Sequence, residues 1–273
     1  MQRLSVMHIW DPEVYEKSSS AQQKWAEELL SKISIKGDER ILDIGCGDGK
    51  ITAEAALLVP GGSIIGLDNS REMLSFARGR FPPVCWPNLD FLYGDASKLL
   101  HEDEFDLVLS FACLHWVRDH GPVLEGIKRC LKNGGRVLMQ FGGLGNAAGI
   151  LDIVDELISE EKWCGYFEAF QFPYGFYGPD EYRTWLDRAG LKAMRVELVA
   201  KDMVQIGREG LVSWFKSTWL PYIEKVPEDL RDDFIDEVVD RYITAYPLDD
   251  KGCVHVGMVR LEVEAEKRCQ EKI

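Results

Sequence analysis

What this 273-residue sequence has little of already narrows its class. No unbroken apolar run approaches the roughly 20 residues that cross a bilayer, and residues 1–13 lack the charged start and apolar core of an export signal. Basic residues are scarce relative to acidic ones, 32 against 46, which leaves a formal net charge of −14. That charge repels phosphate backbones and anionic membrane surfaces. We therefore expect a cytoplasmic protein that neither binds nucleic acid nor inserts into a membrane.

The arrangement of cysteine and histidine excludes several further kinds of site. The seven cysteines form no Cys-x-x-Cys pair and the five histidines show no His-Glu-x-x-His spacing, so no metal site is predicted. The sequence also lacks a Gly-x-Ser-x-Gly elbow and a Gly-Lys-Ser phosphate loop. Nucleophilic hydrolysis and phosphoryl transfer are therefore unsupported.

What is present is a regular alternation of short apolar runs and amphipathic segments between residues 40 and 141. This alternation is typical of strands and helices in turn around a parallel sheet. The predicted strands are 40–44, 63–67, 89–93, 105–111 and 136–141. The predicted helices are 49–58, 70–80 and 122–131, with 21–33 upstream. After residue 142 the pattern changes, and it predicts helices at 151–161, 179–189 and 227–246 and strands at 193–199 and 254–263.

Three features follow successive predicted strands. The first strand breaks into the glycine-rich turn Asp43–Gly47, where the backbone can approach a ligand closely. Asp68 closes the second strand, where a carboxylate can accept both hydroxyl protons of a ribose. Asp95 follows the third strand, where its carboxylate is placed to accept a hydrogen bond from the exocyclic amine of adenine. Each feature alone also has a purely structural interpretation: the glycines permit a turn, Asp68 caps the next helix, and Asp95 is an exposed loop acid. Together they lie at the carboxyl ends of neighbouring strands, which is the edge where ligands bind in open α/β sheets.

The loop has an acidic residue before its first glycine, which departs from the three-glycine dinucleotide fingerprint and resembles class I S-adenosylmethionine-dependent methyltransferases. The resemblance implies S-adenosylmethionine as cofactor, S-adenosylhomocysteine as product and no metal. It places the methionine part on the loop backbone, the ribose on Asp68 and the adenine between Met73 and Asp95. The expected cofactor-binding residues are Tyr15, Asp43, Gly45, Cys46, Gly47, Asp68, Asn69, Met73, Gly94, Asp95, Ala96 and Ser110.

The resemblance also implies the fold. It is α/β, a doubly wound Rossmann-like and mostly parallel seven-stranded sheet with an antiparallel last strand and a helical cap inserted late in the chain. We expect a single methyltransferase domain over residues 1–273. Within it, 1–35 form an N-terminal lid and helix, 36–142 the cofactor-binding core, and 143–190 and 205–250 the cap.

In this family the segment after the fourth strand runs beneath the methyl donor. The resemblance implies that His115 and Trp116 face the substrate, and we take both as candidate catalytic residues. The alternative is that Trp116 belongs to the core and that His115 is a surface histidine. A base is necessary only for a neutral hydroxyl or carbon acid, and His115 is then the first candidate.

Both ends of the chain resemble trans-aconitate methyltransferases. The opening His8–Tyr15 is similar to their Trp-Asn-Pro-x-x-Tyr start, and Leu220, Pro221 and the strand that carries Arg260 are similar to their cap and last strand. This resemblance implies methyl transfer to the carboxylate oxygen of a small molecule. It places Tyr15 in a lid over the cofactor, and the implied substrate-binding residues are Trp10, Trp219 and Arg260.

The sequence departs from that pattern and leaves other functions open. It has no arginine between Leu220 and Pro221, and aromatic residues crowd 163–177. A more apolar acceptor, lipid-like or aromatic, with transfer to carbon or oxygen, is one alternative. A non-catalytic S-adenosylmethionine-binding protein is another. Arg260 alternatively pairs with a surface acid such as Glu262 or Glu264, and we expect a monomer or a homodimer.

Overall fold

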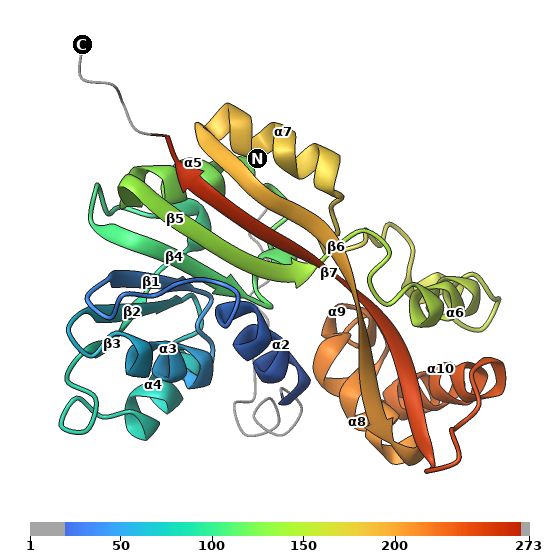
Figure 1. Ribbon diagram of the computed structural model, residues 1–273. Coiled ribbons are helices and arrows are strands. Elements are labelled where there is room, and N and C mark those ends of the chain that lie inside the picture. The colour runs from blue at the N-terminus through green and yellow to red at the C-terminus, as the bar shows by residue number, and fades with distance from the viewer. Residues whose placement is uncertain (1–19, 269–273) are drawn as a thin grey trace. The chain divides into compact units, whose positions relative to one another are not determined.

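The computed structural model describes residues 20–268, and its centre is a seven-stranded sheet in the order β3-β2-β1-β4-β5-β7-β6 (Figure 1). Strands β1 to β5 pair in parallel, and β7 runs antiparallel to β5. The predicted doubly wound sheet with an antiparallel last strand is therefore confirmed. The strands are β1 Arg40–Ile44, β2 Ser63–Asp68, β3 Leu89–Tyr93, β4 Phe105–Phe111, β5 Leu131–Gly142, β6 Leu191–Ile206 and β7 Cys253–Lys267.

The helices agree with the predicted ones except at a few places. Two helices between β6 and β7, α8 and α9, were not predicted, and the predicted helix 227–246 is a short 3-10 turn followed by α10. The α-helices are α2 Ser20–Leu30, α3 Lys50–Leu58, α4 Arg71–Arg80, α5 Gly121–Cys130, α6 Ala148–Ile158, α7 Pro179–Ala189, α8 Gly207–Thr218, α9 Leu220–Ile223 and α10 Arg231–Ala245. The 3-10 helices are η1 Ala96–Lys98, η2 Leu114–Trp116, η3 Cys164–Tyr166 and η4 Glu228–Leu230.

Strand β5 starts earlier than predicted because its first residue already pairs with β4. Leu131 lies opposite Phe105, and the register then shifts so that Arg136 lies opposite Leu107. The residues between them form a bulge in which Gly134 has a φ of 73°. Gly134 and Gly135 therefore belong to the strand, and the helix that precedes it ends at Cys130.

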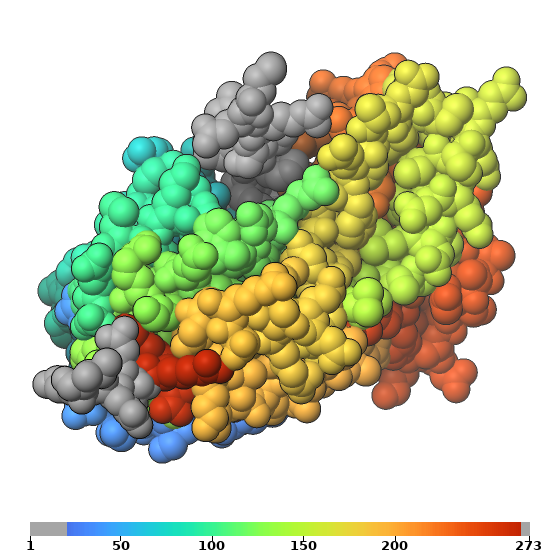
Figure 2. Space-filling view, turned by 90° about the horizontal axis from the view of Figure 1, so that it is seen from above, coloured from blue at the N-terminus to red at the C-terminus, as the bar shows by residue number. Residues whose placement is uncertain are grey.

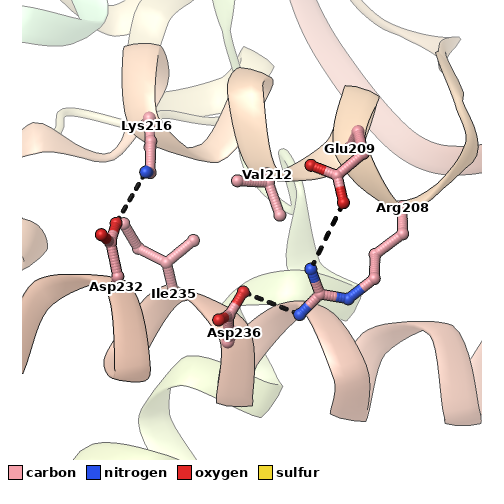
Figure 3. A pocket seen from close by; sticks show the side chains of 7 residues that line it. All are labelled: Arg208, Glu209, Val212, Lys216, Asp232, Ile235 and Asp236. Carbon is pink, nitrogen blue, oxygen red and sulfur yellow. Dashed lines mark hydrogen bonds and ion pairs between the residues drawn. The ribbon is translucent and has the colours of Figure 1, made fainter.

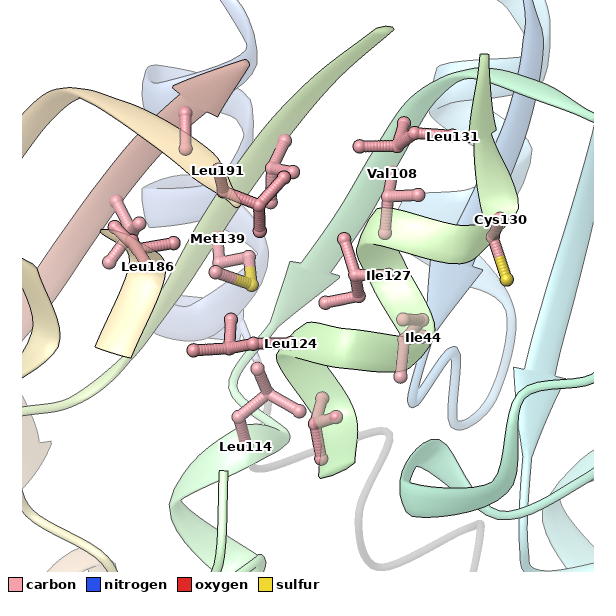
Figure 4. Packing of buried hydrophobic residues seen from close by; sticks show 14 of the residues in the cluster. Ile44, Val108, Leu114, Leu124, Ile127, Cys130, Leu131, Met139, Leu186 and Leu191 are labelled. Carbon is pink, nitrogen blue, oxygen red and sulfur yellow. The ribbon is translucent and has the colours of Figure 1, made fainter. Parts of the chain in front are cut away.

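Both faces of the sheet are covered by apolar helix faces. On one face α5 and α7 contribute Leu124, Ile127 and Leu186 to a fully buried cluster (Figure 4). On the other face α2, α3 and α4 pack against residues such as Ile41 and Leu109. Because the central strands are buried on both sides, they read as continuous apolar runs in the sequence.

The described residues divide into two compact units. One unit comprises residues 20–144, 174–199 and 259–268, and it contains the Asp43–Gly47 turn together with Asp68 and Asp95. The second unit comprises residues 145–173 and 200–258. The predicted cap segment 143–190 differs from this division, since α7 belongs to the sheet unit. Its buried Tyr182 and Leu186 join the core beneath α5, and α5 and α7 contact each other. Gold atoms from the part of the chain near residue 180 are visible on the face that Figure 2 shows.

The second unit has its own aromatic core. Trp163 lies edge-on to Phe234, and Tyr222 packs on Phe170, with ring centroids 5.2 and 4.7 Å apart. A surface groove between α8 and α10 is lined by charges that pair with one another, Lys216 with Asp232 and Arg208 with Asp236 (Figure 3). In residues 20–268, no helix combines the length and apolar composition that crossing a membrane requires.

Candidate functional site

The turn after β1 is held tightly against its neighbours. Gly45 has a φ of +76°, and a Cβ there would lie 2.1 Å from the Sγ of Cys113, so no other residue fits. The backbone N–H groups of Gly45 and Cys46 both donate to the carbonyl of Leu67, at 2.7 and 3.1 Å. The glycine pattern read in the sequence thus forms a turn that connects the ends of β1 and β2.

Asp43 lies beneath this turn and is 2% exposed. Its carboxylate accepts a hydrogen bond of 2.6 Å from the hydroxyl of Thr52 in α3. Burial raises the pKa of Asp43 to about 7, and the nearby charge of Asp68 adds to the shift. The side chain therefore connects the loop to α3 from below.

Asp68 stands at the end of β2 and is half-buried. One carboxylate oxygen accepts from the N–H of Gly47 at 2.9 Å, and the other accepts from the N–H of Ser70 at 2.8 Å. Burial raises its pKa above the usual range. A carboxylate at the end of β2 can also accept hydrogen bonds from the hydroxyl groups of a ligand.

Asp95 caps the short helix η1 after β3. Its carboxylate accepts from the N–H and the hydroxyl of Ser97, at 2.9 and 2.7 Å. Although partial burial raises the pKa of Asp95, the hydrogen bonds from Ser97 and Lys98 lower it overall. The preceding Gly94 allows close packing, because a Cβ there would lie 2.8 Å from Leu67.

The ends of β3, β2 and β1 are neighbours in the sheet, so the three predicted carboxylates are brought to one edge. Met73 is buried in the first turn of α4, where its N–H donates to the hydroxyl of Ser70. Asn69 is exposed and Ala96 partly buried. Ser110 is fully buried, and its hydroxyl donates to the carbonyl of Ile44 at 2.8 Å, which connects β4 to β1.

The segment after β4 turns through η2 and presents two partly exposed rings, His115 and Trp116. The Nδ1 of His115 accepts a hydrogen bond of 3.5 Å from the N–H of Gly142 at the end of β5. Tyr174 lies edge-on to Trp116 at 4.8 Å and stacks on Phe176 at 5.5 Å. Four rings from two separate segments therefore meet at this place.

His120 is a residue that sequence reasoning missed. It is 1% exposed, its Nε2 lies 2.9 Å from the carbonyl of Leu114, and its Nδ1 lies 3.1 Å from the hydroxyl of Tyr182. This arrangement fixes the turn that carries His115. Its only signal in the sequence was a histidine before a helix, which is not specific.

Arg260 is 4% exposed and lies on β7 opposite Gly142. Its guanidinium lies 5.3 Å from the ring centroid of Trp25 in α2. Glu262, one of its suggested partners, is no surface acid. It is fully buried and accepts hydrogen bonds from three side chains, Lys32, Gln140 and Arg195.

The remaining predicted substrate residues are elsewhere. Trp219 belongs to the second unit, is 2% exposed and packs on Trp214 and Tyr222. Trp10 and Tyr15 lie outside the described residues. Across residues 20–268, no group of three or more His, Cys, Asp or Glu side chains is placed to hold a metal ion.

Comparison with known proteins identifies the family of this chain. Residues 35–190, more than half of the chain, match the family model described as a methyltransferase domain. The chain is similar to the trans-aconitate 2-methyltransferases of Acidovorax sp. strain JS42 (29% identical; 96% of this chain and 99% of the relative) and Deinococcus radiodurans (31%; 80% and 83%). The solved phosphoethanolamine N-methyltransferase 2 of Haemonchus contortus, in complex with S-adenosyl-L-methionine, superposes with a TM-score of 0.58 (19% identical; 95% and 57%). The chain therefore belongs to the class I S-adenosylmethionine-dependent methyltransferases.

Proposed function

We propose that this enzyme methylates a carboxylate oxygen of a small molecule. The cofactor, when bound, supplies a methyl group that its sulfonium has already activated. A carboxylate is itself nucleophilic at neutral pH, so the residues of the chain need only align the acceptor and exclude water. The names of the two trans-aconitate 2-methyltransferase relatives support this choice of acceptor.

The residues at the edge of β1, β2 and β3 fit the cofactor by the chemistry of their donors and acceptors. Asp68 stands at the end of β2 with its carboxylate oriented by the backbone N–H groups of Gly47 and Ser70, and a carboxylate so placed suits the two hydroxyls of a ribose. We assign the adenine to Asp95, Ala96 and Met73, and the methionine part to the backbone of the Gly45–Gly47 turn.

The position of Arg260 is the main support for the proposed acceptor. Arg260 lies opposite Gly142, the last residue of β5, and is therefore at the same carboxyl edge of the sheet as the Gly45–Gly47 turn. A guanidinium binds a carboxylate through two parallel hydrogen bonds, which an ammonium group cannot reproduce. The Trp25 ring supports the orientation of this guanidinium.

A panel of small acids, including trans-aconitate and trans-cinnamate, tests the proposal with methyl-labelled S-adenosylmethionine and mass analysis of the products. We expect a methyl ester. In Arg260→Lys the KM for the acid should rise about ten-fold or more, because a hydrogen bond to a charged group contributes roughly 1.5–3 kcal/mol. Cofactor affinity should not change.

Arg241→Lys is the matched control, since Arg241 forms a surface ion pair with Glu160 in the second unit. An Arg260→Lys enzyme whose KM for the methylated acid equals that of the wild type would contradict the anchor.

A different observation favours a second candidate, oxygen or carbon methylation of an aromatic acceptor. The rings of Trp116, Tyr174 and Phe176 surround His115. A neutral phenol would require a base at that position. Phenols in the same panel distinguish the two candidates by the site of methylation.

A further inference from the structure

The hydrogen bond from Gly142 determines which nitrogen of His115 carries its proton. A backbone N–H can only donate, so Nδ1 must present its lone pair to Gly142. In a neutral imidazole the proton is then on Nε2. Within the described residues Nε2 makes no hydrogen bond, so this N–H is the group that His115 can offer to a ligand.

The surroundings of His115 keep the ring neutral. Burial among aromatic rings disfavours the charged form, and the positive charge of Arg260 on β7 acts in the same direction. Together they hold the pKa of His115 well below its usual range. A ring that has no lone pair facing a ligand, and that resists a second proton, is poorly suited to remove a proton.

We infer that His115 is a specificity-determining residue that donates its Nε2–H to the acceptor carboxylate, beside Arg260, and that it is not a general base. This inference rests on the proposed carboxyl transfer. Trp116, Tyr174 and Phe176 form the wall around the donor, with ring centroids 5.8, 6.1 and 6.1 Å from His115. The wall favours a carboxylate attached to a flat, apolar body, so trans-cinnamate should be the better acceptor than trans-aconitate.

The tautomer can be measured without any acceptor. Long-range proton–nitrogen NMR of the uniformly labelled protein reports the protonation state of each imidazole, and the signal missing from His115→Gln assigns this ring. We expect a neutral ring protonated at Nε2 from pH 6.5 to 8.5. A ring protonated at Nδ1, or an imidazolium in that range, would overturn the inference.

Kinetics with a methylated acid from the panel test the role itself. His115→Gln keeps an N–H donor without a titratable group, so its KM for the acid should rise less than that of His115→Phe, with little change in kcat. His115→Phe keeps a flat ring but no donor, so KM for the acid should rise about ten-fold or more with little change in kcat. His101→Gln is the control, because that imidazole pairs with Glu104 near the opposite end of β4.

Two other kinetic outcomes would overturn the inference. A general base would appear as a loss of roughly 10²–10⁴-fold in kcat for His115→Gln, with activity lost at acid pH in the wild type. A purely structural residue would appear as an unchanged KM in His115→Phe at equal thermal stability. If instead the wild type methylates no acid but the NMR shows the Nε2 tautomer, the proposed acceptor fails while the donor assignment stands.

Discussion

At the scale of single residues, Asp68 combines a structural and a proposed functional role. Its two backbone hydrogen bonds connect the Gly47 turn to the first residues before α4. Substitution by alanine would leave both N–H groups without an acceptor, so it would confuse loss of structure with loss of cofactor binding. Asparagine keeps the size of the side chain and one acceptor oxygen, so it tests cofactor binding with less disturbance of the turn.

We predict that Asp68→Asn lowers the affinity for S-adenosylmethionine by about ten-fold or more, since hydrogen bonds to a charged group contribute roughly 1.5–3 kcal/mol. Isothermal titration calorimetry measures this. Asp90→Asn, a change at an exposed residue of β3, is the control. Equal cofactor affinity in a folded Asp68→Asn protein would refute the ribose assignment.

At the scale of elements, the turn between β1 and α3 owes its shape to contacts that a single methyl group would disrupt. Gly45 combines positive φ with a 2.1 Å approach to Cys113, whereas a methyl group added at Gly79 in α4 would have nothing within 4 Å. The two glycines therefore have opposite consequences when replaced by alanine.

Gly45→Ala should destabilise the protein by several kcal/mol, from overpacking of about 1–3 kcal/mol together with backbone strain of about 1–2 kcal/mol. Gly79→Ala should stabilise it by about 0.5–1 kcal/mol, because alanine loses less backbone entropy in a helix. Urea unfolding followed by circular dichroism measures both. The steric account fails if Gly45→Ala unfolds at the wild-type urea concentration.

At the scale of the whole molecule, this strongly acidic chain buries one carboxylate, that of Glu262, between the cationic side chains of Arg195 and Lys32. Glu262 on β7 accepts from Arg195 on β6, Gln140 on β5 and Lys32 after α2, at 2.6, 2.9 and 3.1 Å. Burial alone would raise the pKa of Glu262, but these hydrogen bonds outweigh it and lower the pKa overall. This network connects the antiparallel end of the sheet to α2.

Glu262→Gln should lower the free energy of unfolding by about 3 kcal/mol at pH 7. This value is the lower end of the range for a broken buried ion pair, because Arg195 keeps Glu197 and Glu264 as partners. A lowered folded-state pKa gives stability that is present above the unfolded pKa and is lost as pH falls. The difference between wild type and variant should therefore shrink below about pH 4.5. Urea unfolding at pH 7 and 4 checks this.

The matched control is Glu264→Gln, because Glu264 is partly exposed and contacts Arg195 at 3.6 Å. Its cost should stay below about 1 kcal/mol. A difference between wild type and Glu262→Gln that grows toward acid pH would contradict the network's role.

The sequence by itself determined the strands of the parallel core and the turn between β1 and α3. These features are local: apolar runs of five to seven residues match β1, β3 and β4, and the glycines that the turn requires are adjacent in the chain. It also placed Asp68 and Asp95 at strand ends, because an acid that follows an apolar run is visible without knowing the fold.

Only the tertiary structure decided what surrounds His115. Gly142 and Tyr174 contact it, Arg260 and His120 act on it electrostatically, and no local pattern relates these four segments. It also assigned α7 to the sheet unit and buried Glu262, which sequence reasoning had taken for a surface acid. The physical reason is that hydrophobic periodicity specifies an element and its buried face, whereas sheet order and register, set by packing over the whole chain, specify which side chains meet.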